Sequence, residues 1–100
     1  MKPFQGNVVT ITGGARGIGL ATARYLAERG ATVCLADVLE DDLVKAEESI
    51  AAAFPDINVT YALVDVSNSD MVDEWIKSVK EQFGKIDSCV NNAGTYYRNI

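Results

Sequence analysis

The sequence predicts an α/β fold built on a doubly wound parallel sheet, and two observations carry this prediction. Short apolar runs typical of buried strands alternate with longer segments whose apolar residues recur at steps of three and four. A glycine-rich stretch also joins the first such run directly to the first helical segment. Strands that alternate with helices form parallel βαβ units with right-handed crossovers. We therefore expect the sheet order 3-2-1-4, with the first two helices on one face and the third on the other.

The first half of the chain is expected to hold two strands and two helices. The strands are predicted at 7–12 and 32–37, and the second of them is apolar enough for burial on both faces. The helix between them is predicted at 17–29, with Gly30 as its C-cap. A further helix is predicted at 39–54, because its first turn is acidic and a proline follows its end.

The second half of the chain adds two strands and one helix. The strands are predicted at 58–66 and 87–91. Between them, Ser67 or Asn68 is expected to cap a helix that ends before Gly84. This helix shows a stripe of apolar residues at steps of three and four: Val72, Trp75, Ile76, Val79 and Phe83. This stripe is interpreted as a core face rather than as part of a ligand site.

Composition bounds the class of protein. The chain has 100 residues, of which 48% are hydrophobic, so it has room for one globular domain at most. Its net charge of −5 argues against a nucleic-acid partner or an anionic membrane surface, since both require a basic patch. The absence of histidine removes the commonest metal ligand and the commonest general base. No metal site is therefore expected.

The two cysteines and the N-terminal segment indicate in which cellular compartment the protein is expected. Cys34 and Cys89 each lie in an apolar run and are interpreted as buried, reduced thiols rather than as a disulfide or a metal pair. No stretch has the length of a signal peptide's apolar segment or of a membrane span. The expectation is a soluble, cytoplasmic protein.

The glycine-rich stretch is the segment Thr12-Gly-Gly-Ala-Arg-Gly-Ile-Gly19. It follows the first predicted strand and opens the first predicted helix. Such a turn brings backbone N–H groups toward a ligand, and the helix dipole adds about half a positive charge at the same place. The spacing of Gly13, Gly17 and Gly19 therefore predicts a site for the pyrophosphate of a nucleotide.

Asp37 ends the second predicted strand, eighteen residues beyond Gly19. A carboxylate there can accept hydrogen bonds from both hydroxyls of an adenosine ribose, and it would repel a 2′-phosphate. Alternatively, Asp37 caps the following helix or faces solvent. Arg16 could attract a 2′-phosphate. However, the carboxylate acts at contact distance, so the sequence favours NAD over NADP.

Two further strand ends carry candidate ligand contacts. Asp65 could accept a hydrogen bond from an adenine amino group, and the backbone of Val66 could supply a second contact. The alternative for this pair is a solvated loop. The segment Asn91-Asn-Ala-Gly94 ends the fourth strand. Its small residues allow close approach to a ligand, and an asparagine amide can join adjacent strand ends.

In these motifs the chain resembles the short-chain dehydrogenase/reductase family. Its glycine turn matches the family's TGxxxGxG motif, and 91–94 matches the NNAG motif. The resemblance implies a Rossmann fold, an NAD(P) cofactor and a small-molecule alcohol or carbonyl substrate. The implied pyrophosphate contacts are Gly13, Arg16, Gly17, Ile18 and Gly19. The implied ribose contact is Asp37, the adenine contacts are Asp65 and Val66, and Asn92, Ala93 and Gly94 would lie along the rest of the cofactor.

The family's catalytic tyrosine, lysine and serine lie beyond the NNAG motif, and no residue of this chain takes their place. A family tyrosine is followed four residues later by lysine. Here Tyr25 is followed at that spacing by Arg29, Tyr61 by Asp65 and Tyr96 by Ile100. We therefore assign no catalytic residue within this chain.

Residues 1–100 are accordingly interpreted as the N-terminal part of a single Rossmann domain whose remainder is absent. The full-length protein is expected to be a homo-oligomer, either a dimer or a tetramer, whereas this part alone should be inactive. It would leave the fourth strand as an apolar edge, which favours association. Two other hypotheses stay open: a non-catalytic NAD-binding or regulatory module, and a structural remnant that binds no nucleotide.

Overall fold

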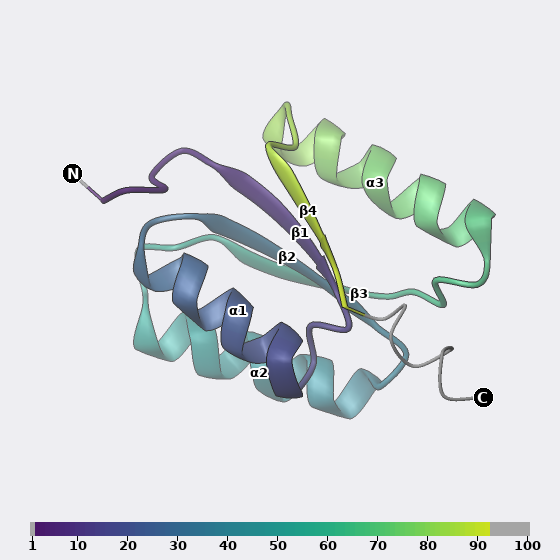
Figure 1. Cartoon of the computed structure of the whole chain (residues 1–100), viewed down its shortest axis with the longest axis horizontal. Coiled ribbons are helices and arrows are strands. Elements are labelled where there is room, and N and C mark those ends of the chain that lie inside the picture. The colour runs from purple at the N-terminus through teal and green to yellow at the C-terminus, as the bar shows by residue number, and fades with distance from the viewer. Residues whose placement is uncertain (1, 93–100) are drawn as a thin grey trace.

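Strands and helices alternate along the whole computed structural model, which describes residues 2–92 (Figure 1). The elements are β1 (Val8–Thr12), α1 (Gly17–Glu28), β2 (Thr32–Asp37), α2 (Glu40–Ala53), β3 (Val59–Leu63), α3 (Ser69–Phe83) and β4 (Ser88–Asn91). In this part of the chain, four parallel strands form a sheet in the order β3-β2-β1-β4. The predicted order 3-2-1-4 and the predicted α/β class are therefore confirmed.

The third strand ends earlier than the sequence predicts, at Leu63 instead of residue 66. Its neighbour in the sheet is β2, and Leu63 pairs with Asp37, the last residue of β2. Beyond this pair the main-chain N–H of Val64 still donates to the carbonyl oxygen of Asp37, at 2.9 Å. The strand ends there because the next residues have no partner strand.

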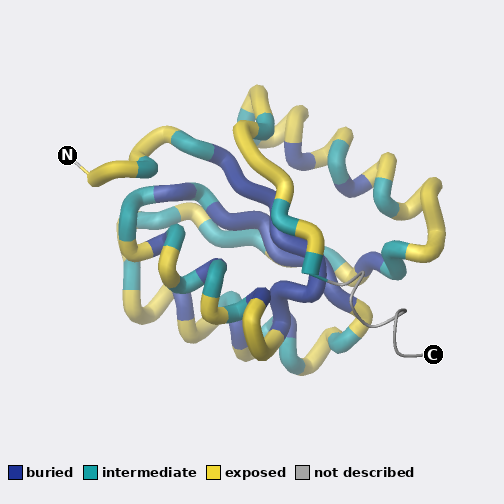
Figure 2. The backbone as a smooth tube through the Cα atoms, viewed as in Figure 1, coloured by how far each residue is buried: buried dark blue, intermediate teal, exposed yellow. Residues whose placement is uncertain are grey.

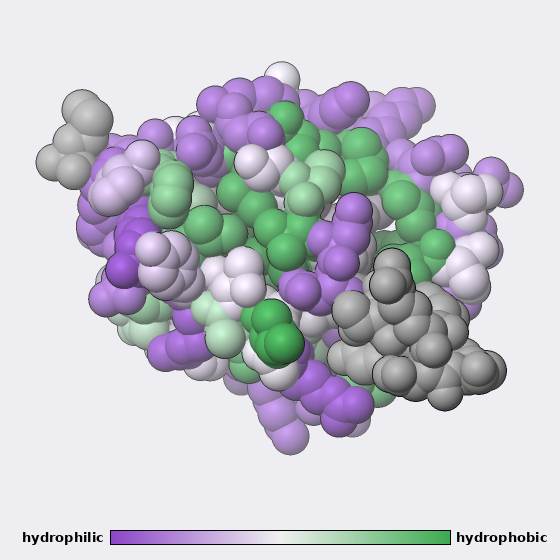
Figure 3. Space-filling model, in the orientation of Figure 1, coloured by the Kyte–Doolittle hydropathy of each residue, from purple (hydrophilic) through white to green (hydrophobic). Residues whose placement is uncertain are grey.

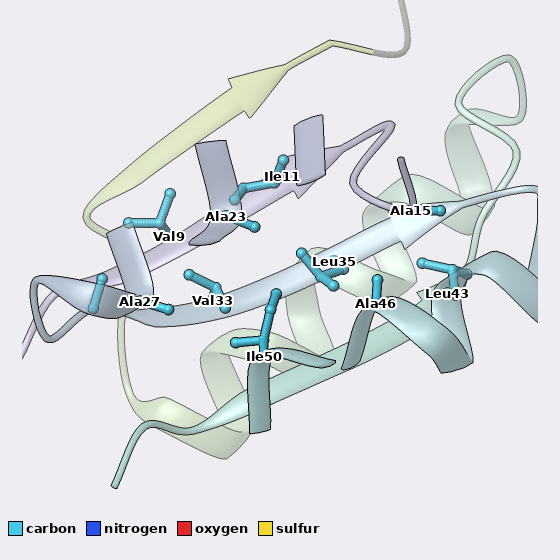
Figure 4. Close-up of a cluster of buried hydrophobic side chains, with 11 residues drawn as sticks. Val9, Ile11, Ala15, Ala23, Ala27, Val33, Leu35, Leu43, Ala46 and Ile50 are labelled. Atoms are coloured by element: carbon cyan, nitrogen blue, oxygen red, sulfur yellow. The ribbon is translucent and has the colours of Figure 1, made fainter. Parts of the chain in front are cut away.

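Helices α1 and α2 cover one face of the sheet (Figure 1). Side chains from β1 and β2 meet those of the two helices in a buried cluster, drawn in Figure 4. Its members are Val9, Ile11, Ala15, Ala23, Ala27, Ala31, Val33, Leu35, Leu43, Ala46 and Ile50. The small residues of α1 allow this helix to lie close to the strands, so the start of α1 is fixed firmly against the end of β1.

Helix α3 lies on the opposite face, as predicted (Figure 1). Trp75 and Val79 are 6% and 3% exposed and pack against Val8 and Cys34, so the stripe on this helix is a core face. The side chain of Asn68, not that of Ser67, caps α3 by accepting the N–H groups of residues 70 and 71. Within residues 2–92, no helix is long and apolar enough to span a bilayer.

The prediction that both cysteines are buried is correct for one of them. Cys34 lies in the middle of the sheet, where burial raises the pKa of its thiol although a hydrogen bond with Thr60 lowers it. Cys89 is exposed. It lies on β4, which pairs only with β1 among the described residues, and Figure 2 shows the exposure of this strand. Figure 3 shows hydrophobic side chains on the surface along this side of the sheet, so an apolar run did not imply burial at this edge.

Asp87 joins the beginning of β4 to the beginning of β1. Its carboxylate accepts the N–H of Val8 at 2.7 Å, and its own N–H donates to the carbonyl oxygen of Val8 at 2.8 Å. The ammonium group of Lys85 lies 3.0 Å from the same carboxylate. Two hydrogen bonds lower the pKa of Asp87: the one from Val8 has the larger effect, and the one from Lys85 has the smaller.

This arrangement predicts a pH-dependent contribution to stability. Because the pKa of Asp87 is lowered in the folded state, its contribution is present above the unfolded pKa of about 3.9 and is lost as the pH falls through the lower folded value. Asp87→Asn should therefore unfold at lower urea concentration than the wild type at pH 7. The two midpoints should converge below the folded pKa. An equal gap between the midpoints at both pH values would contradict the assignment.

Candidate dinucleotide-binding site

The turn between β1 and α1 requires glycine at several positions. Gly13 and Gly17 have φ values of 66° and 61°, in the left-handed region that residues with a Cβ rarely adopt. A Cβ on Gly19 would lie 1.9 Å from the carbonyl oxygen of Gly13, so the first turn of α1 packs directly on the glycine turn. The backbone at Gly13 therefore lies against the backbone at Gly19 with no side chain between them.

The N-terminus of α1 differs from those of the other two helices. Arg16 occupies its N-cap position in an extended conformation without a side-chain cap, and the first turn contains no acidic residue. By contrast, α2 has three acids in its first turn, and α3 is capped by Asn68. The N–H groups of a first helical turn lack partners within the helix, and the dipole makes this end positive. The start of α1 is therefore suited to an anion.

Open space lies in front of this helix end. A Cβ built on Gly17 would meet no heavy atom within 4 Å. The side chains of Arg16 and Ile18 are both exposed, Ile18 at 78%. An approaching phosphate would thus meet backbone N–H groups and one guanidinium, with no carboxylate in the first turn of the helix.

Asp37 lies beside the glycine turn at the end of β2. Asp37 is only 7% exposed to solvent. One carboxylate oxygen, Oδ2, accepts the N–H of Ala15 at 3.2 Å, and the other, Oδ1, accepts the N–H of Val38 at 2.7 Å. Neither alternative from the sequence describes this geometry, because the N-cap of α2 is Leu39 and the carboxylate is not solvent-facing. The ribose contact stays a prediction.

Asp65 and Val66 follow β3 and are half-buried. Asp65 Oδ1 accepts both the N–H of Ser67, at 2.9 Å, and its hydroxyl, at 2.7 Å. The carboxylate thus shapes the turn that leads into α3, which the sequence did not indicate. The adenine contacts of this pair stay a prediction.

Asn92 is the last described residue of the NNAG segment. Its main-chain N–H donates to the carbonyl oxygen of Thr12 at 3.3 Å, so the end of β4 is joined to the end of β1 next to the glycine turn. Ala93 and Gly94, the other two predicted contacts of this segment, lie outside the described residues. Because the four strands are parallel, their carboxyl ends lie together along one edge of the sheet, next to the glycine turn.

A surface hollow of about 410 Å³ adjoins this edge, formed by Val38, Leu39, Glu40, Asp41 and Asp42. Sequence reasoning selected neither this segment nor Ala15, the residue that Asp37 contacts. The pairing of Thr12 with Ala36 places Ala15 near the end of β2, and this register is the signal that could have identified it.

The two tyrosines in the described part of the chain lie within α1 and within β3, not at the carboxyl ends of the strands. Tyr25 lies about two turns along α1, 53% exposed, with the guanidinium of Arg29 3.5 Å from its ring centre. Tyr61 lies on β3, 40% exposed. Tyr96 and Tyr97 lie outside the described residues. Within residues 2–92, no group of three acidic or cysteine side chains is placed to hold a metal ion.

A four-stranded parallel sheet in this order, with a glycine turn between its first strand and first helix, defines a Rossmann-type α/β fold. The sequence comparison narrows this class. Residues 7–99 match the family model described as short chain dehydrogenase, and the chain belongs to that family.

Several known proteins are similar to the chain. Chanoclavine-I dehydrogenase easD of Claviceps purpurea is 44% identical over 95 residues, covering 94% of this chain and 36% of that protein. The structure of NAD+-bound xylitol dehydrogenase is 38% identical with a TM-score of 0.83, covering 88% of this chain and 33% of that one. L-sorbose reductase from Gluconobacter frateurii, complexed with NADPH and L-sorbose, is 38% identical with a TM-score of 0.84, covering 89% and 34%. The chain thus spans about a third of the length of these relatives.

Proposed function

We propose that this chain supplies the NAD-binding part of an oxidoreductase, which transfers hydride between NAD(H) and an alcohol or carbonyl group of a small molecule. Membership of the family and the dehydrogenases and reductases among its relatives support this proposal. The observation that carries the choice of cofactor is the buried carboxylate of Asp37 beside the uncapped N-terminus of α1.

Each part of the proposed site has its own task. The backbone at the start of α1 binds the pyrophosphate, through Gly13, Arg16, Gly17, Ile18 and Gly19. Asp37 accepts hydrogen bonds from the ribose, and Asp65 with Val66 contacts the adenine. Asn92, Ala93 and Gly94 line the remainder of the cofactor. The bound dinucleotide supplies the hydride chemistry, while these residues bind and orient it.

The preference for NAD over NADP rests on charge at Asp37. A 2′-phosphate would bring nearly two negative charges, about −1.5 to −2, next to a carboxylate that is 7% exposed and therefore poorly screened. Arg16 is exposed and offers less compensation across solvent. The two related structures named above hold NAD+ and NADPH respectively, so the preference for NAD is based on this chain's own residues.

Titration of NADH and NADPH fluorescence with the protein as its gene encodes it tests the proposal. NADH should bind at least about tenfold more tightly than NADPH, because like charges at contact distance cost several kcal/mol. Asp37→Ala should narrow the gap between the two Kd values. Tighter binding of NADPH by the wild type would overturn the cofactor preference. No saturable signal with either nucleotide would overturn the proposed function itself.

We propose that none of residues 1–100 transfers a proton in this reaction. Neither Tyr25 nor Tyr61 is followed by lysine four residues later, and Tyr25 contacts an arginine, which stays protonated. The proposed task of this chain is therefore to bind and orient the cofactor. We further propose that the protein as its gene encodes it forms a homo-oligomer, either a dimer or a tetramer.

A further inference from the structure

We infer that Asp37 is also a positioning residue: its carboxylate holds the glycine turn in the shape that receives the pyrophosphate. This inference rests on the proposed function, because it concerns the same site. It adds a task distinct from contact with the ribose. The same side chain would then act on two parts of the cofactor, the adenosine ribose by direct contact and the pyrophosphate through the glycine turn.

Two consecutive N–H groups of the turn bond to two consecutive residues at the end of β2. Gly14 donates to the carbonyl oxygen of Ala36, and Ala15 donates to the carboxylate of Asp37, both at 3.2 Å. The first of these bonds continues the β1–β2 ladder beyond its last pair. The second bond, from the N–H of Ala15, is accepted by a side chain and therefore depends on which residue occupies position 37.

Burial strengthens this attachment. Ala15 and Asp37 are 3% and 7% exposed, and a hydrogen bond to a carboxylate is about twice as strong as one between neutral groups. The turn needs such a restraint because glycines lose more conformational freedom on folding than other residues. Without the carboxylate, the N–H of Ala15 would be buried without this acceptor, a state that native structures avoid.

One carboxylate can serve both tasks at once. Each of its oxygens has two lone pairs, and each accepts one backbone N–H in the structure: Oδ2 from Ala15 and Oδ1 from Val38. One lone pair on each oxygen is then left for a ribose hydroxyl. It follows that replacing Asp37 to relax the NAD preference should also weaken the binding of the pyrophosphate.

An NADH analogue with 2′,3′-dideoxyadenosine separates the two tasks, because it offers Asp37 no ribose hydroxyl. If the inference holds, Asp37→Ala should weaken binding of this analogue about tenfold, as expected for the loss of a hydrogen bond to a charged group. Glu48→Ala is the matched control: it removes an exposed carboxylate of α2 that lies outside the hollow beside the site. It should leave the Kd of the analogue unchanged. An unchanged Kd in Asp37→Ala would overturn the inference.

Hydrogen exchange without any cofactor gives a second, independent readout. The peptide containing Ala15 should exchange faster in Asp37→Ala than in the wild type, and Asp37→Asn should be intermediate, since an amide oxygen can still accept the N–H of Ala15. Equal exchange in all three proteins would overturn the inference. If the wild type binds no NADH, the proposed function fails, while faster exchange in Asp37→Ala would still support the attachment of the turn.

Discussion

Gly19→Ala is expected to disrupt the glycine turn and to weaken dinucleotide binding strongly. The added Cβ would lie 1.9 Å from the carbonyl oxygen and 2.7 Å from the carbonyl carbon of Gly13. Both atoms belong to the backbone, so no side-chain rotation relieves the overlap. Helix α1 must then move away from the end of β1, which disturbs the buried cluster that contains Ala15 and Ala23. We expect a loss of about 3 kcal/mol in the free energy of unfolding.

Urea unfolding and NADH titration measure the two consequences separately. The control is Gly84→Ala at the end of α3, where φ is +83° and a Cβ would meet no atom within 4 Å. Because alanine is strained in this left-handed conformation, Gly84→Ala should lower the free energy of unfolding by about 1–2 kcal/mol. It should leave the Kd for NADH unchanged. Gly19→Ala should lower NADH affinity at least about 100-fold, because the N–H groups of the first turn are displaced from their common direction. Wild-type stability and affinity in Gly19→Ala would contradict the close packing of this turn.

The sheet order and the helix layers were predictable because they follow from local patterns and from chirality. Apolar runs such as 32–37 mark buried parallel strands, and a right-handed crossover fixes where each next strand is placed. The cap of α3 could be narrowed to two residues but not to one. Ser67 and Asn68 have similar capping propensity, and the structure selects Asn68 because Ser67 bonds to Asp65 instead.

What the sequence could not predict depends on contacts between distant segments. Cys89 is in an apolar run but is exposed, because burial of a strand depends on its neighbours in the sheet. The position of Asp37 at a strand end indicated a ligand contact. Its hydrogen bond to Ala15 could not be foreseen, because it needs both the β1–β2 register and the left-handed turn at Gly13.

Gly17→Val is expected to remove cofactor binding while the fold is retained. Gly17 has a φ of +61°, so a β-branched residue there costs about 1–2 kcal/mol of backbone strain. Its Cβ would meet no atom within 4 Å, which means that no part of the core must move. The isopropyl group would instead occupy the space in front of the first turn of α1, where the pyrophosphate is proposed to bind. NADH affinity should fall at least about 100-fold, comparable to the loss of an oriented set of N–H donors.

The ratio of two affinities distinguishes this steric effect from the charge effect at Asp37. Because NADH and NADPH share the pyrophosphate, Gly17→Val should weaken both by the same factor and leave their ratio near the wild-type value. Asp37→Ala should change the ratio, since only NADPH carries the 2′-phosphate that the carboxylate repels. Gly17→Ala, with a smaller side chain, should give an intermediate loss for both nucleotides. A folded Gly17→Val protein that binds NADH with wild-type affinity would refute the assignment of the glycine turn as the pyrophosphate site, because the valine and the phosphate cannot occupy the same space.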